Sequence, residues 1–179
     1  MVINACESDI EKIQTLGIDS KFPDVAAKNI EIIYTDSAKL KMRLRAPEVE
    51  RFSNSERPYM EFPKGLNVEF FSDSMTIEST IEANYAIYYT EEKLWEARGN
   101  VIAKNIAKKE KLNSEELFWN ENDRSIYSNS FTRIENPDGT FYGQNGFESN
   151  QRFSKWRLKG SRGTVNIKDE PADSIENVQ

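Results

Sequence analysis

Apolar and polar residues alternate at every second position along much of this chain, and no other feature constrains its fold more. The segment "LKMRLRA" at 40–46 places leucine and methionine on one face and basic residues on the other. The segments "LNVEFF" at 66–71 and "MTIESTIEA" at 75–83 repeat the pattern. A period of two is typical of strands with one buried face and one solvated face. The sequence therefore predicts an all-β protein of antiparallel strands.

Turn signals separate these segments. "NSERP" at 54–58, "FPKG" at 62–65 and "NPDG" at 136–139 combine the residues that favour loops and hairpins. Only "SDIEKIQTLG" at 8–17 has the spacing of a short helix. The lysine- and glutamate-rich stretch at 105–117 is interpreted as a hairpin with charged residues on its surface. We therefore expect strands throughout, with a short N-terminal helix or tether.

Length and composition set the scale of the protein. The chain has 179 residues, which is enough for one domain with a sizeable core. Its apolar fraction is 37% and its charged fraction 30%, which favours a thin or elongated fold with much solvated surface. We expect three parts: an N-terminal membrane tether at 1–28, a β domain at 29–167 and an acidic disordered tail at 168–179.

Charge and residue content argue against several classes of function. A net charge of −6 argues against nucleic-acid binding, because a phosphate-binding domain normally has a basic excess. No run of 18 apolar residues is present. The chain has no histidine, which removes the Ser-His-Asp triad, the Cys-His pair and almost every zinc site. We assign no catalytic residue, no metal and no cofactor.

A weak repeat of about 30 residues suggests hairpin-sized units stacked along one axis. Such a stack has one apolar face, and we expect the low apolar fraction to leave that face incompletely covered. The inward side chains then either fill a sandwich core or line an open trough for acyl chains, whose burial is worth about 0.8 kcal/mol per methylene. The residues expected to face inward are Leu40, Met42, Leu44, Leu66, Val68, Phe70, Ile77, Ile81, Trp156 and Leu158.

Basic residues alternate with the last two of these side chains. Lys155, Arg157 and Lys159 lie between and beside Trp156 and Leu158 in one expected strand. In one interpretation these cations contact lipid phosphates or an acidic partner. In the other they protect a sheet edge against aggregation.

Four stretches together resemble the LptC family, the periplasmic component of the lipopolysaccharide export machinery. They are "YTDSAKLKMRLRAPEVERFSN" (34–54), "EFPKGLNVEFF" (61–71), "EANYAIYYTEEKLWEARGNVIAKN" (82–105) and "GFESNQRFSKWRLKGSRGTV" (146–165). The "YTDS" opening, the "EFPKG" turn and the "GNV" run occur in the order that the family shows. The likeness extends over roughly residues 29–167.

This resemblance implies a fold and a role. The family fold is a twisted, open, boat-shaped antiparallel β-jelly roll, like that of the neighbouring LptA-like and OstA-like proteins. The implied role is transport without catalysis: the domain accepts lipopolysaccharide from the inner-membrane ABC transporter complex (LptBFG-like) and passes it to an LptA-like periplasmic bridge protein. The acyl chains lie in the apolar trough, and partners dock by pairing of exposed edge strands. The implied location is the periplasm, tethered to the inner membrane.

The only cysteine, Cys6, ends the segment "INAC" at 3–6. It cannot form an internal disulfide, and no imidazole is present to activate it. "INAC" resembles a bacterial lipobox, in which the cysteine is diacylated and becomes the mature N-terminus. Only "MVINA" precedes it, whereas a signal peptide needs a charged start and a longer apolar run. Two interpretations stay open: Cys6 is the lipid anchor of a longer gene product, or it is incidental.

A second class of function is a glycan-binding or glycan-hydrolysing β-jelly-roll lipoprotein. The side chains that would stack on sugar rings are Trp95, Trp119 and Trp156. Hydrolysis would need two carboxylates inside the cleft. Strand parity places Glu69, Glu78 and Glu82 on the face opposite the apolar residues, which argues against catalysis. A third possibility is a structural lipoprotein without a ligand, which a tightly packed interior would support.

Overall fold

A computed structural model describes residues 22–150 and 155–165 of the chain. These residues form one antiparallel sheet of 14 strands and contain no helix, so the predicted all-β fold is confirmed. The expected helix at 8–17 and the expected tail at 168–179 lie outside the described residues. The strands are β1 (Val25–Asp36), β2 (Lys39–Phe52), β3 (Tyr59–Phe62), β4 (Leu66–Phe71), β5 (Ile77–Ala83), β6 (Tyr85–Tyr89), β7 (Leu94–Asn105), β8 (Glu110–Asn120), β9 (Ser125–Ser128), β10 (Thr132–Asn136), β11 (Gly139–Gly143), β12 (Phe147–Asn150), β13 (Trp156–Leu158) and β14 (Ser161–Val165).

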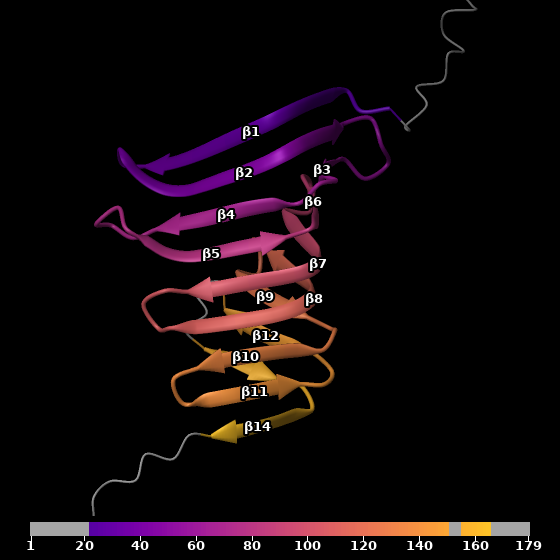
Figure 1. Cartoon of the computed structure of the whole chain (residues 1–179). Coiled ribbons are helices and arrows are strands. Elements are labelled where there is room, and N and C mark those ends of the chain that lie inside the picture. The colour runs from indigo at the N-terminus through magenta and orange to yellow at the C-terminus, as the bar shows by residue number, and fades with distance from the viewer. Residues whose placement is uncertain (1–21, 151–154, 166–179) are drawn as a thin grey trace, which may run out of the picture.

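The sheet folds over on itself into two layers (Figure 1). The front layer contains β1, β2, β4, β5, β10, β11 and β14, and the back layer contains β3, β6, β9, β12 and β13. The long strands β2, β7 and β8 reach both layers, and β2 does so by pairing with β4 in its first half and with β3 at its end. β7 pairs with β6 over its first half and with β5 over its second half, and β8 pairs with β10 and then with β9. β1 and β14 lie at opposite ends of the stack.

Residues with unusual backbone conformations mark where the chain passes between the layers. In β7 the register shifts around Gly99 and Asn100, which have φ angles of +71° and +51°. Gly65, between β3 and β4, has a φ of +77°. A Cβ atom on Gly65 would lie only 2.2 Å from the carbonyl oxygen of Ala83, so the two backbones meet there without room for a side chain. We call the line through these residues the fold line.

The inner face of the front layer carries one continuous, mostly apolar row. Side chains alternate along a strand, so residues paired across neighbouring strands share a face. Leu44, Val68 and Ile81, which sequence parity places inside, belong to this row. From β1 to β14 its members are Ile32, Leu44, Val68, Ile81, Ala103, Leu112, Ile134, Phe141 and Gly163.

The inner face of the back layer carries a row rich in aromatic rings. Tyr88 stacks on Trp95 with ring centroids 4.4 Å apart, and Trp95 stacks on Trp119 at 6.3 Å. Such pairs add about 0.5–1.5 kcal/mol beyond the area that they bury. The row consists of Met60, Tyr88, Trp95, Trp119, Ile126, Ser149 and Trp156.

The buried side chains form two clusters. The first cluster lies toward β1, around Leu44 and Phe62, and the second lies toward β14, around Leu112 and Phe147. Ile81 packs against both clusters, so it joins them on the front layer.

Three hydroxyl groups are buried where β8, β9 and β10 meet. The Oγ atoms of Ser114 and Ser128 lie 3.0 Å apart, and the Thr132 hydroxyl donates to the carbonyl oxygen of Ser130 at 3.1 Å. Ser128 and Thr132 are completely shielded from solvent. These contacts satisfy the buried hydroxyls, which removes the cost of desolvating them.

Candidate functional site

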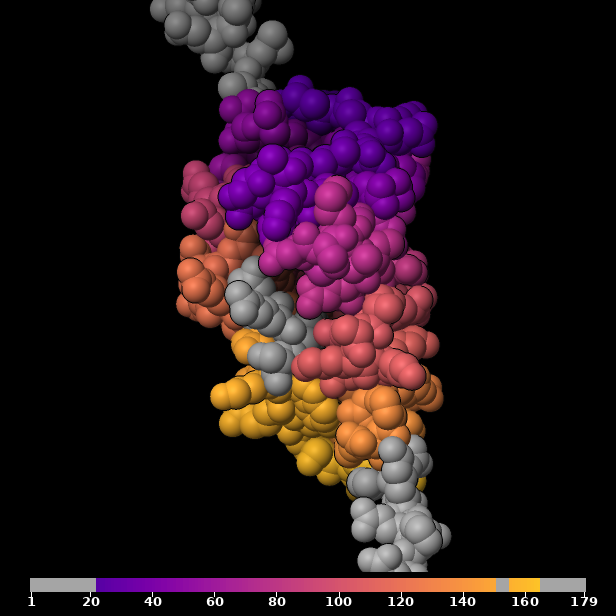
Figure 2. All heavy atoms as spheres, turned by 90° about the vertical axis from the view of Figure 1, so that its left-hand side faces the viewer, coloured from indigo at the N-terminus to yellow at the C-terminus, as the bar shows by residue number. Residues whose placement is uncertain are grey.

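On one side of the molecule the two layers separate and leave a hollow, which we call the trough (Figure 2). Its volume is about 1000 Å³. Its floor is built from both layers, because the inner rows described above continue into it. The apolar side chains of the floor are Phe70, Ile81, Ala103, Leu112, Trp119, Ile126, Ile134, Phe147 and Trp156.

Charged side chains stand around the rim of the trough. The ionisable rim residues are Lys41, Asp73, Glu78, Lys104, Glu110, Lys111 and Arg124. Lys41 Nζ lies 2.6 Å from Asp73 Oδ1, and this hydrogen bond raises the pKa of Lys41 and lowers the pKa of Asp73. Among the described residues, no carboxylate forms an ion pair with Lys104, Lys111 or Arg124. Lys104 and Lys111 alternate with the inward Ala103 and Leu112, so these cations lie at the edge of the trough, beside Glu78 and Glu110, and not over its apolar floor.

The sequence-predicted residues divide into groups by their position. Those that line the trough are Phe70, Ile81 and Trp156. Those that lie in or against the first cluster are Met42, Leu44, Leu66, Val68, Phe70 and Ile81. Leu158 packs against the second cluster, and Leu40 is half-buried. The proposed anchor Cys6 lies outside the described residues.

Ile77 does not lie with the other predicted residues. The register between β4 and β5 shifts after Phe70, so Phe70 pairs with Ser79 while Phe71 pairs with Ile77. An extra residue in one strand moves the following side chains to the other face. Ile77 is 38% exposed and lies outside the lining of the trough, because this irregularity interrupts the alternation that placed it inside.

Sequence reasoning missed most of the floor that β8 supplies. The inward residues of β8 are Leu112 and Ser114 before the fold line, and Leu117 and Trp119 after it. The change from even to odd numbers occurs around Glu115, where the strand passes between the layers. Apolar and polar residues alternate regularly on each side of Glu115. Searching for alternation separately in these two short segments could have located the inward residues.

The tryptophans that were considered for sugar stacking face the interior. Trp95 and Trp119 stack on each other, so each ring is partly covered by the other. The indole nitrogen of Trp95 donates to Glu121 Oε1 at 2.9 Å. The indole nitrogen of Trp119 is buried and has no acceptor among the described residues. Trp156 lines the trough and contacts Phe141 at 5.9 Å between ring centroids.

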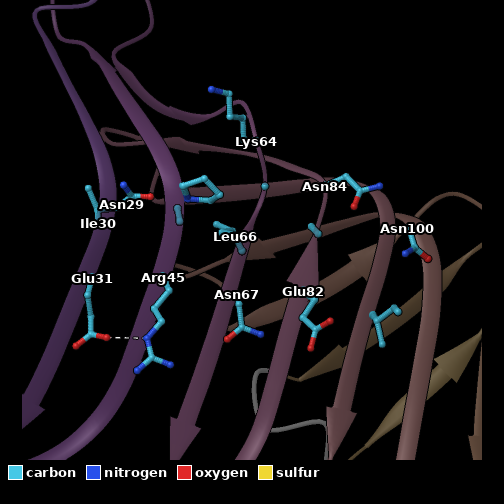
Figure 3. Close-up of a pocket in the computed structure, with 15 residues that line it drawn as sticks. Asn29, Ile30, Glu31, Arg45, Lys64, Leu66, Asn67, Glu82, Asn84 and Asn100 are labelled. Carbon is cyan, nitrogen blue, oxygen red and sulfur yellow. Dashed lines mark hydrogen bonds and ion pairs between the residues drawn. The ribbon is translucent and has the colours of Figure 1, made fainter.

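A second, shallower hollow of about 810 Å³ lies on the outer face of the front layer, beside the fold line (Figure 3). Its side chains are mainly amide and charged groups from β1, β2, β4, β5 and the turns. Glu31 forms an ion pair with Arg45 at 2.6 Å, and this hydrogen bond raises the pKa of Arg45. Lys64 lies 2.5 Å from Glu48 and lowers the pKa of that carboxyl. This outer groove mixes amide and charged side chains with apolar ones such as Ile30, Leu66 and Ile102, and it lies on the face of the front layer opposite the trough.

Carboxylates that could serve a hydrolase are not gathered on the floor of the trough. The buried Glu96, 5% exposed, belongs to the outer face of the back layer, where Arg98 pairs with it and the Tyr89 hydroxyl donates to it at 3.4 Å. Tyr85 donates to Glu61 at 2.8 Å on the same face. Burial, followed by the hydrogen bond to Glu61, raises the pKa of Tyr85 far above its usual value. These acids are therefore held in a hydrogen-bonded network outside the trough.

Within residues 22–150 and 155–165, no group of three or more cysteine and carboxylate side chains is arranged to hold a metal ion. The same part of the chain contains no helix long and apolar enough to cross a membrane.

The sheet ends in strands with only one neighbour among the described residues. β1 pairs only with β2, β14 only with β11, and the short β13 only with β12. On β1, Ile33 and Tyr34 are 56% and 57% exposed. An edge strand with exposed apolar side chains is a surface on which another strand can pair.

Comparison with known proteins agrees with the sequence resemblance. A family model described as "Lipopolysaccharide-assembly, LptC-related" matches residues 2–166. A search of curated proteins returns no match to the chain. The family match covers every strand of the sheet, including both edges and all residues of the trough. The chain therefore belongs to the LptC family of lipopolysaccharide-assembly proteins.

Proposed function

We propose that this protein is a non-catalytic carrier that accepts lipopolysaccharide from the inner-membrane ABC transporter complex (LptBFG-like) and passes it to an LptA-like bridge protein. The observation that carries the proposal is the trough, which joins an apolar floor to an edge lined by cations and carboxylates; among the described residues, Lys104, Lys111 and Arg124 form no ion pair there. A ligand with several acyl chains and anionic groups at one end has the matching chemistry. Membership of the family supports the same role.

The free energy gained by burying acyl chains in the trough is sufficient for binding. Burial of one 12-carbon chain is worth roughly 9 kcal/mol at about 0.8 kcal/mol per methylene. Immobilising the ligand opposes this gain by several kcal/mol. Anionic groups of the ligand would lie near Lys104, Lys111 and Arg124 at the rim, where attraction is screened by salt. We therefore expect affinity to come mainly from the floor and orientation from the rim.

The edges of the sheet supply the route for transfer. The apolar inner row begins at Ile32 on β1 and reaches Phe141 and Gly163 beside and on β14. A partner jelly roll that pairs with either edge would extend the row, and with it the trough, without a polar interruption. We propose that the transporter complex occupies one edge and the bridge protein the other.

We further propose that the protein resides in the periplasm and is held at the inner membrane through the part of the expected tether 1–28 that precedes β1, with Cys6 as the lipid anchor. Metabolic labelling with a fatty acid, followed by mass spectrometry of the N-terminal peptide, tests the anchor. Diacylated Cys6 is the expected result. An unmodified Cys6 in the mature protein would refute this assignment and leave the carrier role unaffected.

Photo-crosslinking in cells tests the carrier role. A photoreactive residue replaces Ile81, which lines the trough, and in a matched control replaces its neighbour Glu82, which lines the outer groove. We expect lipopolysaccharide adducts at position 81 and none at position 82. Adducts at neither position in a folded, periplasmic protein would refute lipid transport. Enrichment of glycan without lipid at position 82 would favour a glycan-binding role instead.

A further inference from the structure

The wall of the trough contains one polar group without a partner. The indole nitrogen of Trp119 is shielded from solvent, and no acceptor lies within hydrogen-bonding distance of it among the described residues. Trp95, its neighbour in the same inner row, differs in this respect. The indole nitrogen of Trp95 donates to Glu121 Oε1 at 2.9 Å. The two stacked rings thus form a pair in which one N–H is satisfied and the other is not.

A buried indole N–H without an acceptor needs a physical explanation. Leaving a buried donor unsatisfied costs about 1–3 kcal/mol, and native proteins keep few such groups. The surroundings of Trp119 are apolar: Trp95 stacks on one side, Phe70 meets it edge-on at 77°, and Ile126 is its cross-strand partner. A water molecule needs two or more polar partners, and these neighbours supply none. None of the described residues supplies a partner for Trp119, which points to an acceptor carried by a bound ligand.

We propose that Trp119 is a specificity-determining residue whose indole N–H donates to an oxygen carried within the hydrocarbon part of the ligand. The inference rests on the proposed function of the trough. The trough then prefers acyl chains that bear a hydroxyl, ester or amide oxygen over unsubstituted chains. Because the nitrogen is shielded, the acceptor reaches it as side chains of the wall turn aside. Phe70 contacts Trp119 and also lines the trough, so we assign the necessary movement to its ring.

Nuclear magnetic resonance of the full chain tests this contact directly. The chain has three tryptophans, so its proton–nitrogen spectrum contains three indole signals that single Trp→Phe variants assign. The probes are tetradecanoic acid and hydroxytetradecanoic acids with the hydroxyl at different depths. One hydroxylated acid should move the Trp119 indole proton downfield, and tetradecanoic acid should not. No ligand-specific downfield shift at Trp119 under saturation would overturn the inference.

Affinity measurements separate hydrogen bonding from packing. Trp119→Phe should weaken binding of the preferred hydroxylated acid about tenfold more than binding of tetradecanoic acid, which is about 1.4 kcal/mol. Trp95→Phe is the matched control and should weaken both acids equally. An equal loss of both acids in Trp119→Phe would mean that the ring only packs. If wild-type protein binds neither the acids nor lipopolysaccharide, the proposed function itself fails, and this result is distinct from loss of oxygen selectivity.

Discussion

The close approach of two backbones at the fold line predicts that Gly65→Ala is much more damaging than Gly99→Ala. Both glycines have nearly the same backbone conformation, with φ of +77° and +71°. Placing an L-residue there costs about 1–2 kcal/mol in either case. The gain from reducing the flexibility of the unfolded chain is also common to both substitutions. The two variants therefore differ mainly in what the new methyl group touches.

The atoms that the new methyl group would touch determine how far the two variants differ in stability. At Gly99 the nearest atom is Cβ of the exposed Asn84 side chain at 3.3 Å, so a shift of only a few tenths of an ångström is needed there. At Gly65 it would lie 2.2 Å from the backbone oxygen of Ala83, which cannot move without shifting β5. Overpacking of this kind costs about 1–3 kcal/mol or more. Gly65→Ala should therefore be less stable than Gly99→Ala by about 1–3 kcal/mol.

Urea and thermal unfolding followed by circular dichroism measure this difference. For a chain of this length, 1 kcal/mol corresponds to about 2–4 °C in Tm. Gly99→Ala should lower Tm by about 2–8 °C, and Gly65→Ala should lower it further. Equal losses in the two variants would show that backbone conformation alone requires glycine at Gly65. The close contact with the backbone of β5 would then not be a reason why glycine is needed at position 65.

Three further predictions concern the rest of the sheet. Leu44→Ala should cost about 2–5 kcal/mol in urea unfolding, because this side chain is 1% exposed in the first cluster. Thr132→Val should cost about 0.5–1.5 kcal/mol, because it removes the buried hydrogen bonds to Ser114 and Ser130 while both groups keep other partners; a loss near zero would contradict this account. Hydrogen bonds from Ser53 lower the pKa of Asp24 below its ordinary value of 3.8. The stabilisation of the start of β1 is therefore present above pH 3.8 and is lost as the pH falls through the lowered pKa, which a titration of the Ser53 amide shift will show.

The front layer was largely predictable because most of its length keeps a period of two. Leu44 and Val68 face the interior as alternation predicts, since β2 and β4 pair without irregularity in this region. The alternation of apolar and polar residues does not show where the pairing register between two strands shifts. Ile77 therefore lies on an exposed part of the sheet, although its spacing from Ile81 is that of an inward residue.

The back layer was harder to predict because it depends on pairings that are distant in sequence. Trp95 and Trp119 are brought together by the β7–β8 pairing, and the residues between them include the turn and both passages across the fold line. Their spacing in the sequence does not reveal that β7 and β8 bend. The missing acceptor of Trp119 is likewise a property of packing, and no sequence pattern reports it.

The arrangement of strands as a stack with two clusters also bears on how the protein unfolds. Each strand pairs only with its neighbours in the stack, and the clusters meet at Ile81 and at the contact between Trp95 and Trp119. Stability in such a molecule is close to a sum over adjacent units rather than a property of the whole chain. Amide exchange should then be fastest in β1 and β14 and slowest in β7 and β8, so the ends fray while the middle stays folded. A partner strand added at either end would protect that end from fraying.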